Sequence, residues 1–337
     1  MTGSKEENGS NNSNDISHSN SSTKKLPKNW AIILVYTYIH VLGIIGLYLL
    51  FTKVKWMTLL YFLFHVTISY VTIGAVHRYY AHQAFIVISE LRFFLVLAHT
   101  IAGVGSIYKW VFWHRIHHYY HNSDRDPYDH RKGFFYSHVL SNLQYAPPDL
   151  KLYSKNIDMR DVDSDRFVWV QQKFYHILFF VLGLLLPMYV PVTYWDESFW
   201  YTFFVIGATR LMITTHISWL VNSALSVWGL QKEDRYPVND NSVFFLSKSY
   251  WANYHYIIPY DWKSNEFGLY ENGFTTFIFK IWYEMGLIDG MKTVNTEDVR
   301  ETLEKIAISK VSIKNAFDEL KEKSEINACK QRLIYRP

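Results

Sequence analysis

Residues 56–82 read WMTLLYFLFHVTISYVTIGAVHRYYAH, a run of mainly apolar residues that leads directly into two histidines. A helix needs roughly 20 mainly apolar residues to cross a hydrocarbon core about 30 Å thick, so residues 56–76 predict a membrane-spanning helix. His77 and His82 lie where that helix would leave the membrane. The stretch therefore predicts a membrane protein with ligand-forming side chains at one end of a span.

Three further blocks have the same length and apolar character, at residues 29–52, 174–195 and 199–221. Together the blocks predict an all-α integral membrane protein with four transmembrane helices. Three lysines, Lys24, Lys25 and Lys28, precede the first block, and such residues favour the cytosolic side. Because an even number of crossings returns the chain to its starting side, both termini are expected in the cytosol.

A shorter apolar stretch, from Leu91 to Tyr108, is interrupted by Gly103 and Gly105. One crossing here would place the histidines before and after it on opposite sides of the membrane, and two crossings do not fit into so few residues. We therefore expect a buried or re-entrant helix pair, since irregular backbone at membrane depth is tolerated where protein covers it. The alternative is an ordinary fifth span.

The remaining segments set the domain boundaries. Residues 1–28 are rich in Ser and Asn and predict a disordered tail. Residues 29–310 form the predicted membrane domain, in which the mixed, aromatic-rich sequence after residue 221 predicts a cytosolic helical cap. Residues 311–337 are assigned to a C-terminal tail. A net charge of +4 over 337 residues does not favour nucleic-acid binding, and a single cysteine excludes an internal disulfide.

A second histidine group, HRIHH at residues 114–118, follows the interrupted stretch. Spacings of three and four residues place His114, His117 and His118 on one face of a helix. Neutral imidazole is the commonest protein ligand for borderline metals such as iron and zinc. The two groups therefore predict a metal site, and His121 extends the same face.

These motifs resemble those of the membrane-bound fatty acyl-CoA desaturases of the stearoyl-CoA (delta-9) type. HRYYAH and HRIHH are similar to the first two histidine boxes of that family. Three later stretches resemble the family in the same order, DRDPYDHRKGFFYSHV (124–139), WLVNSALSVWG (219–229) and NYHYIIPYDWKSNEFG (253–268). The resemblance covers most of residues 30–310.

The resemblance implies a protein of the endoplasmic reticulum membrane with four spans and a cytosolic cap. In the family that cap holds two irons through nine histidines and a water-linked asparagine. The implied reaction is the oxygen-dependent insertion of a cis double bond into a fatty acyl-CoA, with electrons from cytochrome b5.

The resemblance also assigns individual positions. Family ligand positions are kept at His77, His82, His114, His117, His118, His255 and Asn222. Three histidine positions are changed, to Ser226, Ala252 and Tyr256. Alanine cannot bind a metal, and serine and neutral tyrosine are poor ligands, so we expect one iron or none in place of two.

A second departure concerns CoA. The basic pair with which the family contacts the CoA phosphates aligns with Tyr145 and Ala146, and Trp113 replaces an acidic residue before HRIHH. Phosphate recognition depends on cationic donors. Both departures favour a catalytically impaired family member that binds a lipid or acyl-CoA, or that associates with cytochrome b5 or an active paralogue.

Two other interpretations remain open at this point. An active desaturase or hydroxylase could use a rearranged ligand set, for which His121 and Asp126 are the leading candidates, with Asp124, His130 and His138 nearby. Exchange of histidine for carboxylate is chemically reasonable at non-haem iron. Alternatively, the substrate could be a lipid without CoA, which would account for the missing phosphate-binding pair.

Overall fold

A computed structural model describes residues 26–224, 226, 251–267, 270–309 and 311–335. It shows a helical bundle whose length is set by four helical spans, each long and apolar enough to cross a membrane. The fold is therefore that of an all-α integral membrane protein, as the sequence predicts. The predicted disordered tail lies almost wholly outside the described residues.

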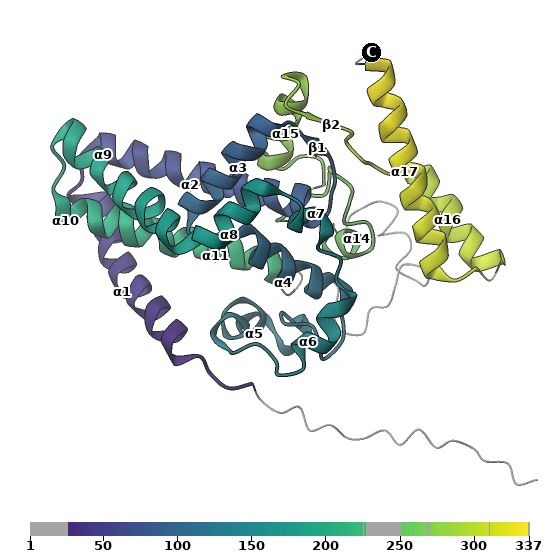
Figure 1. Ribbon diagram of the computed structural model, residues 1–337, viewed down its shortest axis with the longest axis horizontal. Helices are drawn as coiled ribbons and strands as arrows, with labels where there is room; N and C mark the ends of the chain where they lie inside the picture. The colour runs from purple at the N-terminus through teal and green to yellow at the C-terminus, as the bar shows by residue number, and fades with distance from the viewer. Residues whose placement is uncertain (1–25, 225, 227–250, 268–269, 310, 336–337) are drawn as a thin grey trace, which may run out of the picture.

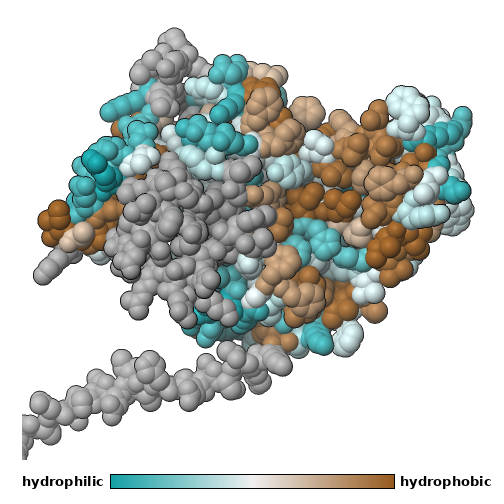
Figure 2. All heavy atoms as spheres, turned by 180° about the vertical axis from the view of Figure 1, so that it is seen from behind, coloured by the Kyte–Doolittle hydropathy of each residue, from teal (hydrophilic) through white to brown (hydrophobic). Residues whose placement is uncertain are grey.

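The four spans are each close to the predicted blocks. The first is α1 (Trp30–Thr52), and the second is α2 (Trp56–Val76) continued by the π-helical turn η1 (His77–Ala81). The third joins α8 (Arg166–Leu178), η5 (Phe179–Leu185) and α9 (Leu186–Trp195), and the fourth joins α10 (Phe199–Thr202), η6 (Phe203–Thr209) and α11 (Arg210–Ser223). The fourth span is the most buried, over 67% of its apolar stretch, and α1 the least, over 11%. Figure 2 shows the apolar surface gathered over this bundle.

Close packing joins α1 to the fourth span. A Cβ atom at Gly46 would lie 2.2 Å from both the backbone oxygen of Phe204 and Oγ1 of Thr209, so only glycine allows this approach. At the end of the bundle away from His77, the backbone N–H of Lys55 donates to the Glu197 carboxylate over 2.9 Å. Because α2 runs from this closed end to His77, the histidines lie at the opposite end.

The interrupted stretch forms two helices, α3 (Ser89–Ala102) and α4 (Ile107–Tyr119), which meet at an angle of 87°. The break follows Gly103, whose φ of +75° is a conformation that glycine adopts freely. His82, before the pair, and His114, after its bend, are in contact through their Nε2 atoms at 2.9 Å. Since both ends reach the same place, the pair does not act as a single crossing.

Arg210 places a charged side chain inside the apolar bundle. Its guanidinium is fully buried and donates to the backbone oxygens of Ile206, Ile101 and Gly183. The oxygen of Ile101 belongs to the last turn of α3, where helix carbonyls lack partners within the helix. Arg210 therefore ties the bent pair to the third and fourth spans.

The cap is built from shorter elements at the histidine end. After α4 come η2 (His130–Lys132), α5 (Phe134–His138), η3 (Leu140–Leu143), α6 (Leu150–Tyr153), η4 (Ser154–Asn156) and α7 (Arg160–Asp163). α14 (Trp251–Ile257) and α15 (Phe274–Glu284) follow the fourth span. β1 (Ile86–Val87) and β2 (Ile288–Asp289) pair as a short antiparallel ribbon.

The C-terminal part is helical on both sides of the boundary that we placed at residue 310. α16 (Thr296–Ser309) and α17 (Ile313–Tyr335) lie antiparallel, as Figure 1 shows. Ion pairs Lys305–Glu319 and Lys323–Asp298 join them. The segment assigned to a tail therefore pairs with the amphipathic helix before it.

Candidate metal centre

Five imidazoles meet at the end of the second span. We call His77, His82, His114, His118 and His255 the histidine cluster. The Nε2 atom of His82 lies 3.1 Å from that of His77 and 2.9 Å from that of His114, and the Nε2 atoms of His77 and His255 are 3.2 Å apart. The π-helical turn η1 with the residue after it, the second half of the bent pair and α14 supply these side chains. Four of the five, His77, His82, His114 and His255, bring one ring nitrogen each within 4.8 Å of one another.

Hydrogen bonds on the other ring nitrogens fix which atoms face the point where these rings meet. Nδ1 of His77 donates to Glu266 Oε1 over 3.2 Å, and Nδ1 of His114 donates to Asn222 Oδ1 over 2.8 Å. The neutral rings then carry lone pairs on Nε2. Converging lone pairs repel one another unless a cation or shared protons lie between them. Partners of this kind orient imidazoles in known metal sites.

Sequence reasoning missed the carboxylate that holds His77. Glu266 is fully buried and also accepts from Nε of Arg78 at 2.6 Å and from Nη2 of Arg78 at 3.0 Å. Arg78 lies inside the HRYYAH motif and Glu266 at the end of NYHYIIPYDWKSNEFG. Both were visible there as charged residues, but nothing in the sequence pairs residues 188 positions apart.

His118 has no hydrogen-bond partner on either ring nitrogen within the described part of the chain, although both atoms are buried. Its ring centroid lies 4.4 Å from that of His82 and 4.7 Å from that of His114. A buried imidazole without partners is costly. His118 thus packs against the other cluster rings but is not one of the four whose ligand atoms lie within 4.8 Å of one another.

The side chains around His117 are arranged differently from the histidine cluster. Nε2 of His117 is hydrogen-bonded to the Tyr256 hydroxyl, and Nδ1 of His117 donates to Asp126 Oδ1 over 2.6 Å. Ser226, at another changed position, donates to the Ser137 hydroxyl over 3.0 Å. Ala252 lies in α14. The side chain of Tyr256 therefore takes the place in which a metal would meet His117.

The candidate substitute ligands divide into two groups. His121 and Asp126 lie beside His117, with one ligand atom of each of the three within 4.8 Å of the others. His138 is instead hydrogen-bonded to His216 and Ser223, and Asp124 to Arg131. Of the described residues named as substitutes, His121 and Asp126 thus lie beside His117 and not within the histidine cluster.

Burial controls the protonation of the centre. It lowers the pKa values of His82, His114, His118 and His255 well below 6.5, and the neighbouring imidazoles add to the effect. Burial also raises the pKa of the Tyr256 phenol well above 10, and Asp126 adds to it. Burial alone would raise the pKa of Glu266, but Arg78 and His77 hold it well below its usual range. At neutral pH the imidazoles are free to bind metal, while the phenol keeps its proton.

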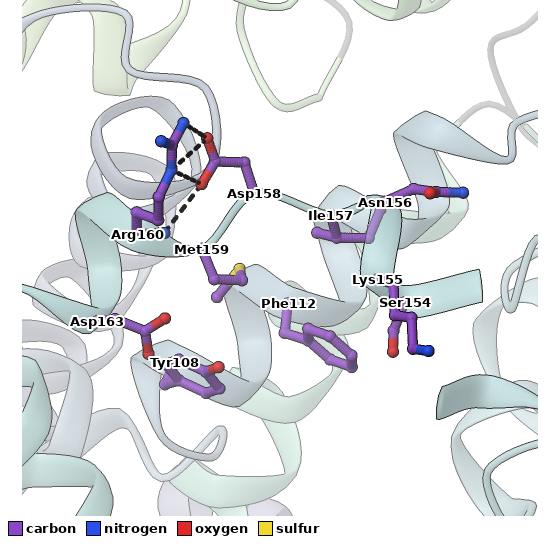
Figure 3. Close-up of a pocket in the computed structure, with 10 residues that line it drawn as sticks. All are labelled: Tyr108, Phe112, Ser154, Lys155, Asn156, Ile157, Asp158, Met159, Arg160 and Asp163. Carbon is purple, nitrogen blue, oxygen red and sulfur yellow. Dashed lines mark hydrogen bonds and ion pairs between the residues drawn. The ribbon is translucent and has the colours of Figure 1, made fainter. Parts of the chain in front are cut away.

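A surface pocket of about 600 Å³ lies between α4 and the segment around α7. Figure 3 shows Tyr108 and Phe112 at its base and Arg160 paired with Asp158 at its edge. No histidine lines this pocket. Tyr145 and Ala146, which align with the basic pair that contacts CoA in the family, do not line this pocket. The backbone N–H of Tyr145 donates to the backbone oxygen of Pro27 over 3.0 Å.

Comparison with known proteins shows the family. The chain is 35% identical over 280 residues to an acyl-CoA Delta-9 desaturase of Acheta domesticus, covering 82% of this chain and 78% of that protein. It is 35% identical over 274 residues to an acyl-CoA Delta-12 desaturase of Tribolium castaneum, covering 80% and 76%. The chain belongs to the acyl-CoA desaturase family. Human stearoyl-CoA desaturase 5 is 34% identical over 259 residues, covering 75% and 78%. No family model matches the sequence.

The desaturase family implies iron, and the two family positions differ in how well they suit it here. The histidine cluster fits a metal, because ring nitrogens of four of its members converge and the Nδ1 atoms of His77 and His114 are held by Glu266 and Asn222. The second position does not fit, because a phenol with a raised pKa already bonds to His117. The histidine cluster therefore suits a metal better than the position around His117 does.

Proposed function

We propose that this membrane protein of desaturase-type lipid metabolism binds one iron in the histidine cluster and is impaired in the family reaction. The observation that supports the proposal is the hydrogen bond between the Tyr256 hydroxyl and Nε2 of His117. Nδ1 of His117 donates to Asp126, so Nε2 carries the single lone pair of the neutral ring, and that lone pair accepts from the phenol. The phenol and a metal therefore compete for the same ring nitrogen.

The histidine cluster can still support oxidation chemistry if it binds iron. An iron in the cluster would supply the oxidising power that an unactivated methylene requires, and side chains alone cannot supply it. The protein contributes ligand orientation through Glu266 and Asn222 and excludes water by burying the rings. Loss of one partner of a metal ligand typically costs about 10–100-fold in affinity or activity, and three changed ligand positions are expected to cost more.

We propose acyl-CoA or a related membrane lipid as the bound molecule, because the relatives are named for acyl-CoA and stearoyl-CoA. We assign the protein to the endoplasmic reticulum membrane, with both termini and the cap in the cytosol. Cytochrome b5 or an active paralogue is the proposed protein partner. Lysines before α1 support this orientation.

The test compares the purified full-length protein with a desaturase that has all nine histidines, prepared identically. Elemental mass spectrometry should find iron that depends on the cluster, lost in His114→Ala but kept in His176→Ala, which removes an exposed imidazole. With acyl-CoA, oxygen and an electron donor, the wild-type protein should form far less unsaturated product than the comparator. Product at the comparator's rate, or no iron that depends on His114, would contradict the proposal.

A further inference from the structure

A second group of unsatisfied polar atoms lies on the Nδ1 side of His117. Asp126 is 2% exposed, and its Oδ1 accepts hydrogen bonds from His117 Nδ1 at 2.6 Å and from the Tyr128 N–H at 2.9 Å. Its other oxygen, Oδ2, is buried and accepts none from the residues that the structure describes. Nδ1 of His121 is buried and equally unpartnered within the same residues. These two atoms face each other across 3.9 Å.

That separation suits a cation better than a direct hydrogen bond. A hydrogen bond between nitrogen and oxygen closes at about 2.7–3.2 Å. Two ligands of one zinc-like ion, each about 2.0–2.2 Å from it, are separated by up to about 4 Å. A carboxylate oxygen left unpaired in the interior is strongly unfavourable. A cation between Asp126 Oδ2 and His121 Nδ1 would satisfy both atoms at once.

A third imidazole stands next to the pair. The His130 ring stacks on that of His121 with centroids 5.3 Å apart, and its Nδ1 is buried with no partner in the described part of the chain. His117 is also within reach of such a cation, but both of its nitrogens are engaged, one by Asp126 and one by Tyr256. The ligand atoms that come within 4.8 Å of one another are those of His117, His121 and Asp126, so His130 stands beside the site.

The group is distinct from the second iron position of the family. Asp126 contacts Nδ1 of His117, whereas Tyr256 occupies Nε2 on the opposite side of that ring. The Tyr256 ring also stacks directly on His121, with centroids 3.8 Å apart. The phenol thus separates the group from the histidine cluster.

We propose that Nδ1 of His121 and Oδ2 of Asp126 bind a divalent transition-metal cation of the zinc type, with water as the remaining ligands. An imidazole together with a carboxylate favours borderline ions such as Zn²⁺ and Co²⁺ over Ca²⁺ and Mg²⁺. A bound ion would join two points of the segment after α4, because His121 and Asp126 both follow the end of that helix at Tyr119. The site does not depend on iron in the histidine cluster.

The test uses full-length protein in detergent, stripped of metal and titrated with Co²⁺ alone. Retained cobalt is counted after desalting, and its visible absorption reports the coordination. Wild-type protein should retain two equivalents, of which His121→Ala loses one and His82→Ala the other. His121→Ala breaks no hydrogen bond at Nδ1, so it should keep the cobalt of the cluster, which shows that it has folded.

Asp124→Asn is the matched control for Asp126→Asn, because Asp124 carries an exposed carboxylate that pairs with Arg131. It should retain both equivalents, whereas Asp126→Asn should lose the same one as His121→Ala. Cobalt binding that is unchanged in His121→Ala and Asp126→Asn would overturn the inference, as would equal loss in Asp124→Asn. If the single equivalent present depends on His121 and not on His82, the inference stands and the proposed function fails.

Discussion

Changing Glu266 to Gln should destabilise the protein and weaken metal binding together. The carboxylate and the Arg78 guanidinium form an ion pair whose side chains are 0% and 1% exposed. The neutral amide of the variant would not offset the charge of Arg78, which would stay buried beside Thr275, Thr276 and the oxygen of Trp262. His77 would lose a charged acceptor for its Nδ1–H at the same time.

Removing one partner of a buried ion pair costs about 3–5 kcal/mol. For a protein of this size, each kcal/mol shifts the thermal midpoint by roughly 2–4 °C, so Glu266→Gln should lower it by on the order of 10 °C. Losing the orienting partner of a ligand should weaken metal affinity by about 10–100-fold. Replacing both charges, as in Arg78→Met with Glu266→Met, should recover most of the stability because no unpaired charge remains.

Thermal unfolding in detergent, followed by tryptophan fluorescence, measures the first effect, and cobalt titration measures the second. Asp158→Asn is the matched control, because its ion pair with Arg160 is exposed and should have no measurable effect. A midpoint within about 2 °C of wild type for Glu266→Gln, with unchanged cobalt affinity, would refute the view that this buried pair holds His77 in place.

Three further outcomes are expected. Burial lowers the pKa values of the cluster imidazoles outside the span, so near their ordinary pKa the unfolded chain binds more protons than the folded chain. Metal-free protein should therefore lose stability as the pH falls below about 6.5. Each imidazole contributes up to about 1.4 kcal/mol of stability per pH unit. Thermal midpoints measured from pH 7.5 to 5.5, with and without cobalt, should show that bound metal delays the loss of stability. A midpoint that does not change with pH would contradict this. The combined change Ser226→His, Ala252→His and Tyr256→His should restore a second iron and acyl-CoA desaturation, measured as metal content and as unsaturated product. If no second iron binds, the surrounding structure has diverged from the family as well. Gly46→Val should separate α1 from Thr209 and greatly reduce the yield of folded protein in detergent. Gly207→Ala, where a Cβ would meet the flexible Met188 side chain at 3.2 Å, should reduce it less.

Local sequence features predicted the membrane architecture. An apolar run reports a span because backbone groups in hydrocarbon must be paired within a helix, and the four predicted blocks correspond to helical spans. Gly103 and Gly105 marked the bend between α3 and α4. The predicted boundary at residue 310 did not indicate that the segment after it is helical. α17 gains its stability from packing on α16, and the local sequence of a polar helix does not reveal such packing.

The histidine motifs identified the residues of the histidine cluster, but the geometry of the cluster depends on contacts between distant segments. Arg78 with Glu266, and His114 with Asn222, are pairs separated by 188 and 108 positions. A sequence shows which residues can bind a metal. It does not show which ring nitrogen another side chain has already taken.

By itself, the sequence predicted the family and the four spans, and its resemblance to that family implied the loss of histidine at Ser226, Ala252 and Tyr256, because spacing and residue type are properties of the linear chain. Tertiary structure alone decided that the Tyr256 hydroxyl bonds to His117 and that Asp126 and His121 face each other across 3.9 Å. The physical reason is that metal binding requires lone pairs to converge within a few ångströms. That convergence is produced only when α4, α14 and the segment after α4 fold against the end of the second span.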